Sequence, residues 1–133
     1  MNTKIAIIKA ARSLWNSLPI LVGVVMLIAL VPSRIHYIFT ESTWINVLLG
    51  DVFGSVSAGN PLTSYVIGGE LLKQGINLYA VTAFLVAWVT VGIVQLPAES
   101  IMLGKKFAVL RNALSFIFAM VVAIITVYLV NLL

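Results

Sequence analysis

The chain has 133 residues, of which 62% are hydrophobic and only 9% are charged. A soluble domain carries about 25% charged residues, so this composition excludes an ordinary water-facing surface and indicates an integral membrane protein. The formal net charge is +4. The basic residues flank apolar stretches, which is typical of topology signals and lipid-headgroup contacts rather than of nucleic-acid binding. The absence of cysteine excludes disulfides and thiolate metal sites.

Three stretches without a charged residue lie at 13–33, 74–98 and 112–133. At about 1.5 Å per residue, each can cross a hydrocarbon core of roughly 30 Å. We therefore expect full transmembrane helices over about 13–33, 77–97 and 112–133, within a single membrane domain that spans 1–133. The first apolar run is longer than that of a typical signal peptide and no A-x-A site follows it, so we expect a retained helix. Pro32 marks its end, and Arg34, His36 and Tyr37 then sit at an interface.

Residues 50–75, GDVFGSVSAGNPLTSYVIGGELLKQG, fit poorly in a simple lipid-facing helix. The run from Gly54 to Gly59 predicts a break, after which Asn60 is a good N-cap and Pro61 suits the first helical position. The flanking pieces, over about 42–73, are each about 16–20 Å long, which is half a membrane. Two arrangements remain open, a re-entrant helix–loop–helix hairpin and a single discontinuous span.

Positive charge favours the re-entrant hairpin, because cytoplasmic loops are enriched in lysine and arginine. With the N-terminus and the loop 98–111 both inside, six basic residues are cytoplasmic and only Arg34 and Lys73 are outside. If the chain crossed the membrane once between those two residues, four basic residues would lie inside and four outside. We therefore expect an all-α polytopic membrane protein with three full transmembrane helices plus a broken re-entrant helical hairpin. We expect the protein to lie in the plasma membrane, with its N-terminus in the cytoplasm and its C-terminus outside.

Small residues four apart predict the faces through which the long helices pack. Ser115, Ala119 and Ala123 share one face of the last helix, and Ala83 and Ala87 share one face of the helix before it. Small side chains let helices approach closely in lipid.

The break offers the groups that a polar or anionic solute needs. Interrupted membrane helices often build transport sites, and a helix N-terminus favours negative charge. The candidate substrate-pathway residues are Ser55, Ser57, Gly59, Asn60, Pro61, Thr63 and Ser64. The alternative is a glycine-rich bend that only lets helices pack.

Three carboxylates are candidates for ion coupling, because ionisable groups inside a membrane are expensive and often functional. They are Asp51, Glu70 and Glu99. A structural alternative exists for two of them: Glu70 can pair with Lys73 three residues on, and Glu99 can pair with a basic residue of its own loop, namely Lys105, Lys106 or Arg111.

No enzyme motif is present. With one histidine and no cysteine, the chain lacks the usual ligands of a zinc site. Neither the G-x-S-x-G motif of serine hydrolases nor a phosphate-binding loop occurs. We expect no enzymatic activity, no cofactor and no metal.

Three segments together resemble a half-length member of the predicted permease family that includes the organoarsenical efflux permeases. They are GNPLTSYVIGGE (59–70), VQLPAE (94–99) and LGKKFAVLRN (103–112). The resemblance covers most of residues 40–133. Full-length relatives contain two similar halves that face each other, so it implies a homodimer or higher homo-oligomer with the broken helices at the shared interface.

One departure limits what the resemblance implies. Its arsenical-exporting members carry a cysteine-containing motif in the broken helix, whereas this chain has serine, alanine and glycine around 55–61. Capture of an arsenical by a thiolate is therefore not carried over. The resemblance implies a permease subunit, with a site near Ser57, Asn60 and Pro61, that moves a small solute. The alternative is a structural or assembly subunit of a larger membrane complex.

Overall fold

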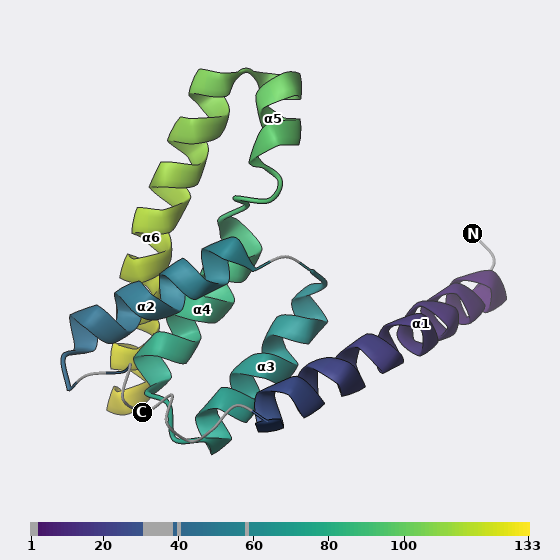
Figure 1. The fold of residues 1–133 in the computed structure, drawn as a ribbon, viewed down its shortest axis with the longest axis horizontal. Coiled ribbons are helices and arrows are strands. Elements are labelled where there is room, and N and C mark those ends of the chain that lie inside the picture. Colours follow the sequence, from purple (N-terminus) through teal and green to yellow (C-terminus); the bar gives the residue numbers. More distant parts are fainter. Residues whose placement is uncertain (1–2, 31–38, 40, 58) are drawn as a thin grey trace.

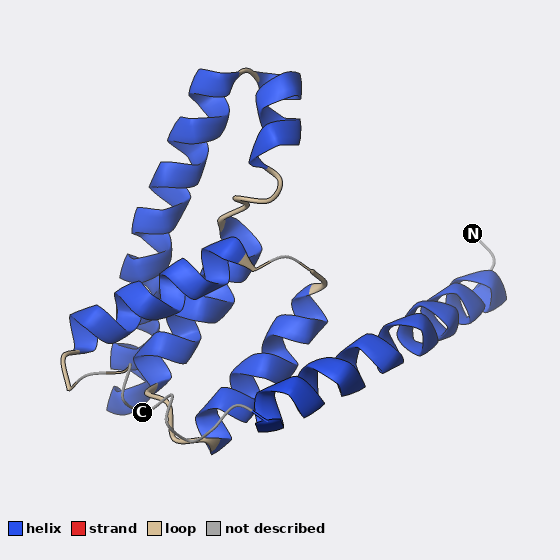
Figure 2. Cartoon of the chain, viewed as in Figure 1, coloured by secondary structure: helices blue, strands red, loops and turns tan. Residues whose placement is uncertain are grey.

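The computed structural model describes residues 3–30, 39, 41–57 and 59–133. Over these residues the chain is all α-helical, as the sequence predicts, and Figure 2 shows helices joined only by loops. In chain order the helices are α1 (Thr3–Leu30), α2 (Thr43–Val56), α3 (Pro61–Lys73), α4 (Leu78–Thr90), α5 (Leu96–Leu103) and α6 (Lys105–Leu132). The predictions made for Pro32, Arg34, His36 and Tyr37 lie outside the described residues.

The broken helix forms where the sequence predicts it. Asn60 caps α3, its side-chain Oδ1 accepting a hydrogen bond from the Leu62 amide at 3.0 Å, and Pro61 occupies the first helical position. The prediction was wrong about Gly54, which lies inside α2 rather than in the break. There it allows α2 to pack closely on α4, and the break itself begins at Ser57.

The end of α3 is fixed by a glycine. Gly75 has a φ of 82°, a conformation that glycine adopts without penalty. Its amide donates to the Leu72 carbonyl at 2.9 Å, and the Ile76 amide donates to the Leu71 carbonyl at 3.1 Å. Ile76 also packs near Leu71. This is the Schellman pattern, which satisfies carbonyls that the helix leaves without a partner.

The helix predicted over 77–97 is shorter than expected. α4 ends at Thr90 and a turn follows. A separate helix, α5, then runs from Leu96, near the end of the predicted span, to Leu103 in the region predicted as a loop. The residues around the turn read VTVGIV, and β-branched residues and glycine are poor helix formers. Pro97, which lacks an N–H, also disfavours helix before it. With 13 residues, α4 is about 20 Å long, which is half a membrane.

The last helix is longer than predicted. α6 begins at Lys105 rather than at Asn112, directly after Gly104, whose φ of 91° reverses the chain. Its 28 residues give a length of about 42 Å. Within the described residues, α6 is the helix that is long and apolar enough to cross a membrane, and α2 and α4 are apolar but shorter.

The predicted small-residue faces are confirmed as packing surfaces. Ala83 on α4 meets Val47 on α2 and Ala123 on α6, and Ala87 meets Ala119 one turn away; all five side chains are buried. Small side chains on both helices therefore bring α4 and α6 together, as Figure 1 shows for the lower half of α6.

α4 is the centre of the bundle. Both α2 and α3 pack on α4, and within the described residues they do not contact each other. α1 packs on α3 near its C-terminal end, and its N-terminal part points away from the other helices (Figure 1). α5 folds back along the first turns of α6. The two halves of the predicted hairpin are thus held apart by a third short helix.

Two glycines bring α2 unusually close to α4. A Cβ on Gly50 would overlap the carbonyl oxygen of Ala80, and a Cβ on Gly54 would overlap that of Phe84 and lie 2.9 Å from the Ala87 Cβ. The facing atoms are mostly backbone and cannot swing away. These glycines therefore fix the position of the break relative to α4.

Candidate functional site at the broken helix

A tryptophan of α4 ties the break to that helix. Trp88 on α4 donates from Nε1 to the carbonyl oxygen of Gly59 at 3.4 Å, and its ring stands edge-on to Phe84 at 5.3 Å. Gly59 has a φ of 153°, which other residues rarely adopt. Gly59 lies 29 residues before Trp88 in the chain, so this link to the break depends on the tertiary fold.

The seven predicted pathway residues divide into a buried and a more exposed group. Ser55, Thr63 and Ser64 are buried. Gly59, Asn60 and Pro61 are exposed and Ser57 is partly exposed, so these four form the accessible rim of the break.

The serine hydroxyls are satisfied by their own helices. Ser55 donates to the Asp51 carbonyl at 2.6 Å, Ser57 to the Phe53 carbonyl at 2.7 Å, and Ser64 to the Pro61 carbonyl at 2.7 Å. Each hydroxyl oxygen keeps its lone pairs and can still accept a hydrogen bond. The break therefore offers acceptors more readily than donors.

The N-terminus of α3 is also occupied from within the chain. The amides of Leu62 and Thr63 donate to the side chain and the carbonyl of Asn60, at 3.0 and 2.9 Å. An anion at this helix end would have to compete with Asn60 for those amides. The helix dipole still favours negative charge there.

Asp51 differs from the other polar residues of this region. Its side chain is fully buried on the face of α2 that packs on α4, and neither carboxyl oxygen has a hydrogen-bond partner. Buried polar groups are nearly always paired, so an orphaned carboxyl calls for an explanation.

The other two coupling candidates are paired. Glu70 contacts Lys73 at 3.3 Å on the exposed side of α3. Glu99 contacts Arg111 at 2.8 Å, one of the partners that the sequence offered for it. The structure does not bring Glu70 or Glu99 to the break.

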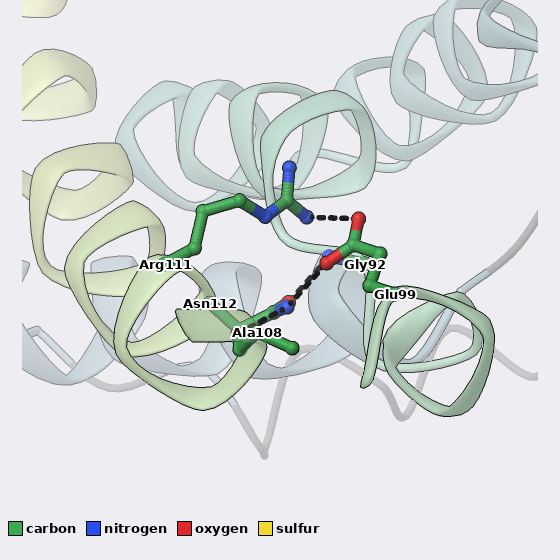
Figure 3. Close-up of polar contacts among 5 residues, drawn as sticks. All are labelled: Gly92, Glu99, Ala108, Arg111 and Asn112. Carbon is green, nitrogen blue, oxygen red and sulfur yellow. Dashed lines mark hydrogen bonds and ion pairs between the residues drawn. The ribbon is translucent and has the colours of Figure 1, made fainter. Parts of the chain in front are cut away.

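A second polar cluster, shown in Figure 3, closes the turn between α4 and α5. Asn112 accepts a hydrogen bond from the Gly92 amide at 2.9 Å, and its Nδ2 donates to Glu99 at 3.3 Å and to the Ala108 carbonyl at 3.1 Å. Glu99 in turn forms an ion pair with Arg111. Asn112 was expected only as the start of the last span. Its one sequence signal is an amide side chain beside an apolar stretch.

Among the described residues, no three acidic or histidine side chains are placed to hold a metal ion. Comparisons with protein-family models, with curated proteins and with solved structures find no match for this chain. The resemblance to the permease family therefore stays a prediction.

Proposed function

We propose that this chain is a multi-pass membrane protein that works as a permease subunit. It moves a small polar or anionic solute through a pathway formed when two copies associate. The observation that carries the proposal is the break between two half-length helices, with a buried, unpartnered carboxyl group one to two turns before it. Irregular backbone and ionisable groups at membrane depth are characteristic of transport sites.

The surface supports a lipid environment. Large apolar side chains stay exposed along α5 and α6, among them Ile101 at 87%, Met102 at 82% and Phe118 at 60%. Only 17% of the most apolar 18-residue stretch of α6 is buried, so α6 does not resemble the core helix of a soluble protein. Lipid, or a partner inside lipid, would cover such a surface.

The arrangement of the helices is compatible with the expected topology, with one change. In this proposal α1 and α6 cross the bilayer, and α4 with α5 forms a discontinuous crossing antiparallel to α6. α2 and α3 enter and return. The end of α3, with Lys73, lies at the opposite end of the bundle from the basic turn between α5 and α6 (Figure 1). This separation supports placing Lys73 and the basic turn on opposite sides of the membrane, and we propose that the basic turn and the N-terminus are both cytoplasmic, in the plasma membrane.

A structural subunit is the second candidate, and a specific observation favours it. The serine hydroxyls of the break donate within their own helices, and Gly50 and Gly54 serve close packing. In that case the break is a packing device, and function requires other chains.

Solute flux in proteoliposomes separates the two candidates. The protein, purified alone, is reconstituted, and the liposomes are shocked with a panel of polyols, monovalent anions and organic phosphates. The shock shrinks the liposomes, which swell again as the solute enters. If the chain is a permease, liposomes that contain it should swell back faster than empty liposomes for at least one solute. A folded homodimer that accelerates none of them would contradict it, as would co-purification with obligatory partner chains.

Two matched cap variants show whether the break itself carries the flux. Asn60 and Asn77 cap α3 and α4 in the same way, each accepting from the amide two residues on, at 3.0 and 2.8 Å. Replacing either by alanine should cost about 1 kcal/mol of stability. Only Asn60→Ala should also change the flux or the solute preference.

A further inference from the structure

Asp51 is the one aspartate of the chain, and it lies in an unusual place. Its side chain has no exposed surface, and both carboxyl oxygens lack a hydrogen-bond partner. A charged carboxylate without partners is very costly in such surroundings, so the site must be occupied by something that neutralises it.

No described basic side chain is placed to neutralise it. α2 packs on α4 and α6. α2 has no other charged residue, α4 has Tyr79 as its one titratable group, and the part of α6 beyond Asn112 has only Tyr128. The basic residues of α6, Lys105, Lys106 and Arg111, belong to its first turns, which lie beside α5.

The other three carboxylates of the chain do not share this situation. Glu70 is paired with Lys73, and Glu99 is paired with Arg111 and Asn112. Glu41 is exposed. Burial without a partner therefore singles out Asp51 from the coupling candidates.

A proton fits the site better than a metal ion does. A bound metal cation needs several oxygen ligands. Among the described residues, no cluster of acidic or histidine side chains is placed to supply such a set of ligands. A proton needs no ligand beyond the carboxyl oxygen that binds it.

We propose that Asp51 is a buried proton-binding site, and that uptake and release of this proton drive solute movement through the broken helix. The coupling half of this inference rests on the proposed function. Ser55 lies one turn beyond Asp51 on the same face of α2, and the accessible rim begins at Ser57, about 9 Å along the helix axis. In the arrangement described here Gly50 and Gly54 close α2 against α4. Separation of the two helices would let water reach the carboxyl group, accept its proton and leave a carboxylate.

The first test uses the fact that the chain has a single aspartate. Protein made by cell-free synthesis with carboxyl-labelled carbon-13 aspartate is placed in lipid nanodiscs, with glutamate left unlabelled. Infrared and solid-state NMR spectra then report Asp51 alone, with no variant needed. We expect a carboxylic-acid signal at neutral pH that shifts in D₂O. A carboxylate signal at neutral pH, or an acid signal that never exchanges, would overturn the proton site.

The second test separates coupling from transport. Proteoliposomes carry a trapped pH dye, and solute and proton movement are followed together in wild type and in Asp51→Asn, a near-isosteric change. We expect proton movement to be lost in Asp51→Asn while downhill exchange of solute persists, with both kept in the control Glu70→Gln. Solute flux without proton movement in the wild type overturns the coupling and leaves the permease standing. Absence of any solute flux counts against the permease and its coupling, while the isotope signal still decides the proton site.

Discussion

Replacing Gly50 by alanine tests the contact between α2 and α4. The added Cβ would lie 2.8 Å from the carbonyl carbon and 3.0 Å from the Cα of Ala80, and closer still to its oxygen. Carbon atoms in contact prefer about 3.5–4.0 Å, so α2 must move by roughly 1 Å. The facing atoms are backbone, and only movement of a whole helix can relieve the overlap.

The expected magnitude combines two opposing effects. Overpacking a close contact costs about 1–3 kcal/mol. Alanine in place of glycine stabilises a helix interior by about 1 kcal/mol. Because rigid backbone puts the overlap at the upper end of its range, we expect Gly50→Ala to lower the free energy of unfolding by about 1–2 kcal/mol.

Gly69 is the matched control. It lies in α3, and a Cβ there would meet nothing within 4 Å. Gly69→Ala should therefore raise stability by up to about 1 kcal/mol. The assay is reversible unfolding in mixed micelles by titration with SDS, followed by the fluorescence of the three tryptophans. If Gly50→Ala proves as stabilising as Gly69→Ala, the close approach of α2 and α4 is wrong.

Three further changes test the local structure with the same assay. Asn112→Ala removes the partner of the Gly92 amide, and a partly buried amide left unpaired should cost about 1–3 kcal/mol; an unchanged midpoint would argue against the cluster in Figure 3. Gly59→Ala forces a side chain into a backbone conformation with φ of 153°, which should cost about 1–3 kcal/mol, and a neutral result would mean that the break has another geometry. Glu70→Gln removes an exposed ion pair with Lys73 and should change stability by less than about 1 kcal/mol; a larger loss would show that Glu70 has a buried role.

Local signals predicted much of the fold. Asn60 followed by Pro61 specifies a helix start whatever lies around it, and Gly75 specifies a helix end. The spacing of Ala83 with Ala87, and of Ala119 with Ala123, places small side chains on one face of each helix. These features depend on neighbours in the chain, which the sequence displays directly.

Features that depend on distant partners were not predictable in the same way. Gly54 looks like a helix breaker, but it lies inside α2, where a side chain would overlap Phe84 and Ala87. The end of α4 is stabilised by Asn112, 20 residues further along the chain. A hydropathy pattern continues through this turn and so gives no sign of it.

The candidate site was predicted in part for the same reason. The residues of the break were identified from their types, and Asp51 was one of three carboxylates named as coupling candidates, two of which also had a possible basic partner nearby in the sequence. Burial without a partner, which distinguishes Asp51, is a property of the packed helices. Sequence alone could offer Lys73 as a partner for Glu70, because these two residues are neighbours on one helix.

A solute pathway through the broken helix requires that water reach the break. The chain has no cysteine, so Ser57→Cys carries the only thiol. A membrane-impermeant maleimide is added to oriented vesicles from each side in turn, and reaction requires a thiolate in water. Lys106→Cys at the basic turn is the accessible control, and Phe118→Cys on the exposed apolar face of α6 is the lipid-facing control. We expect Ser57→Cys to react from one side, as Lys106→Cys does, while Phe118→Cys stays unlabelled. A Ser57→Cys thiol that reacts only after denaturation would contradict a water-filled pathway at the broken helix.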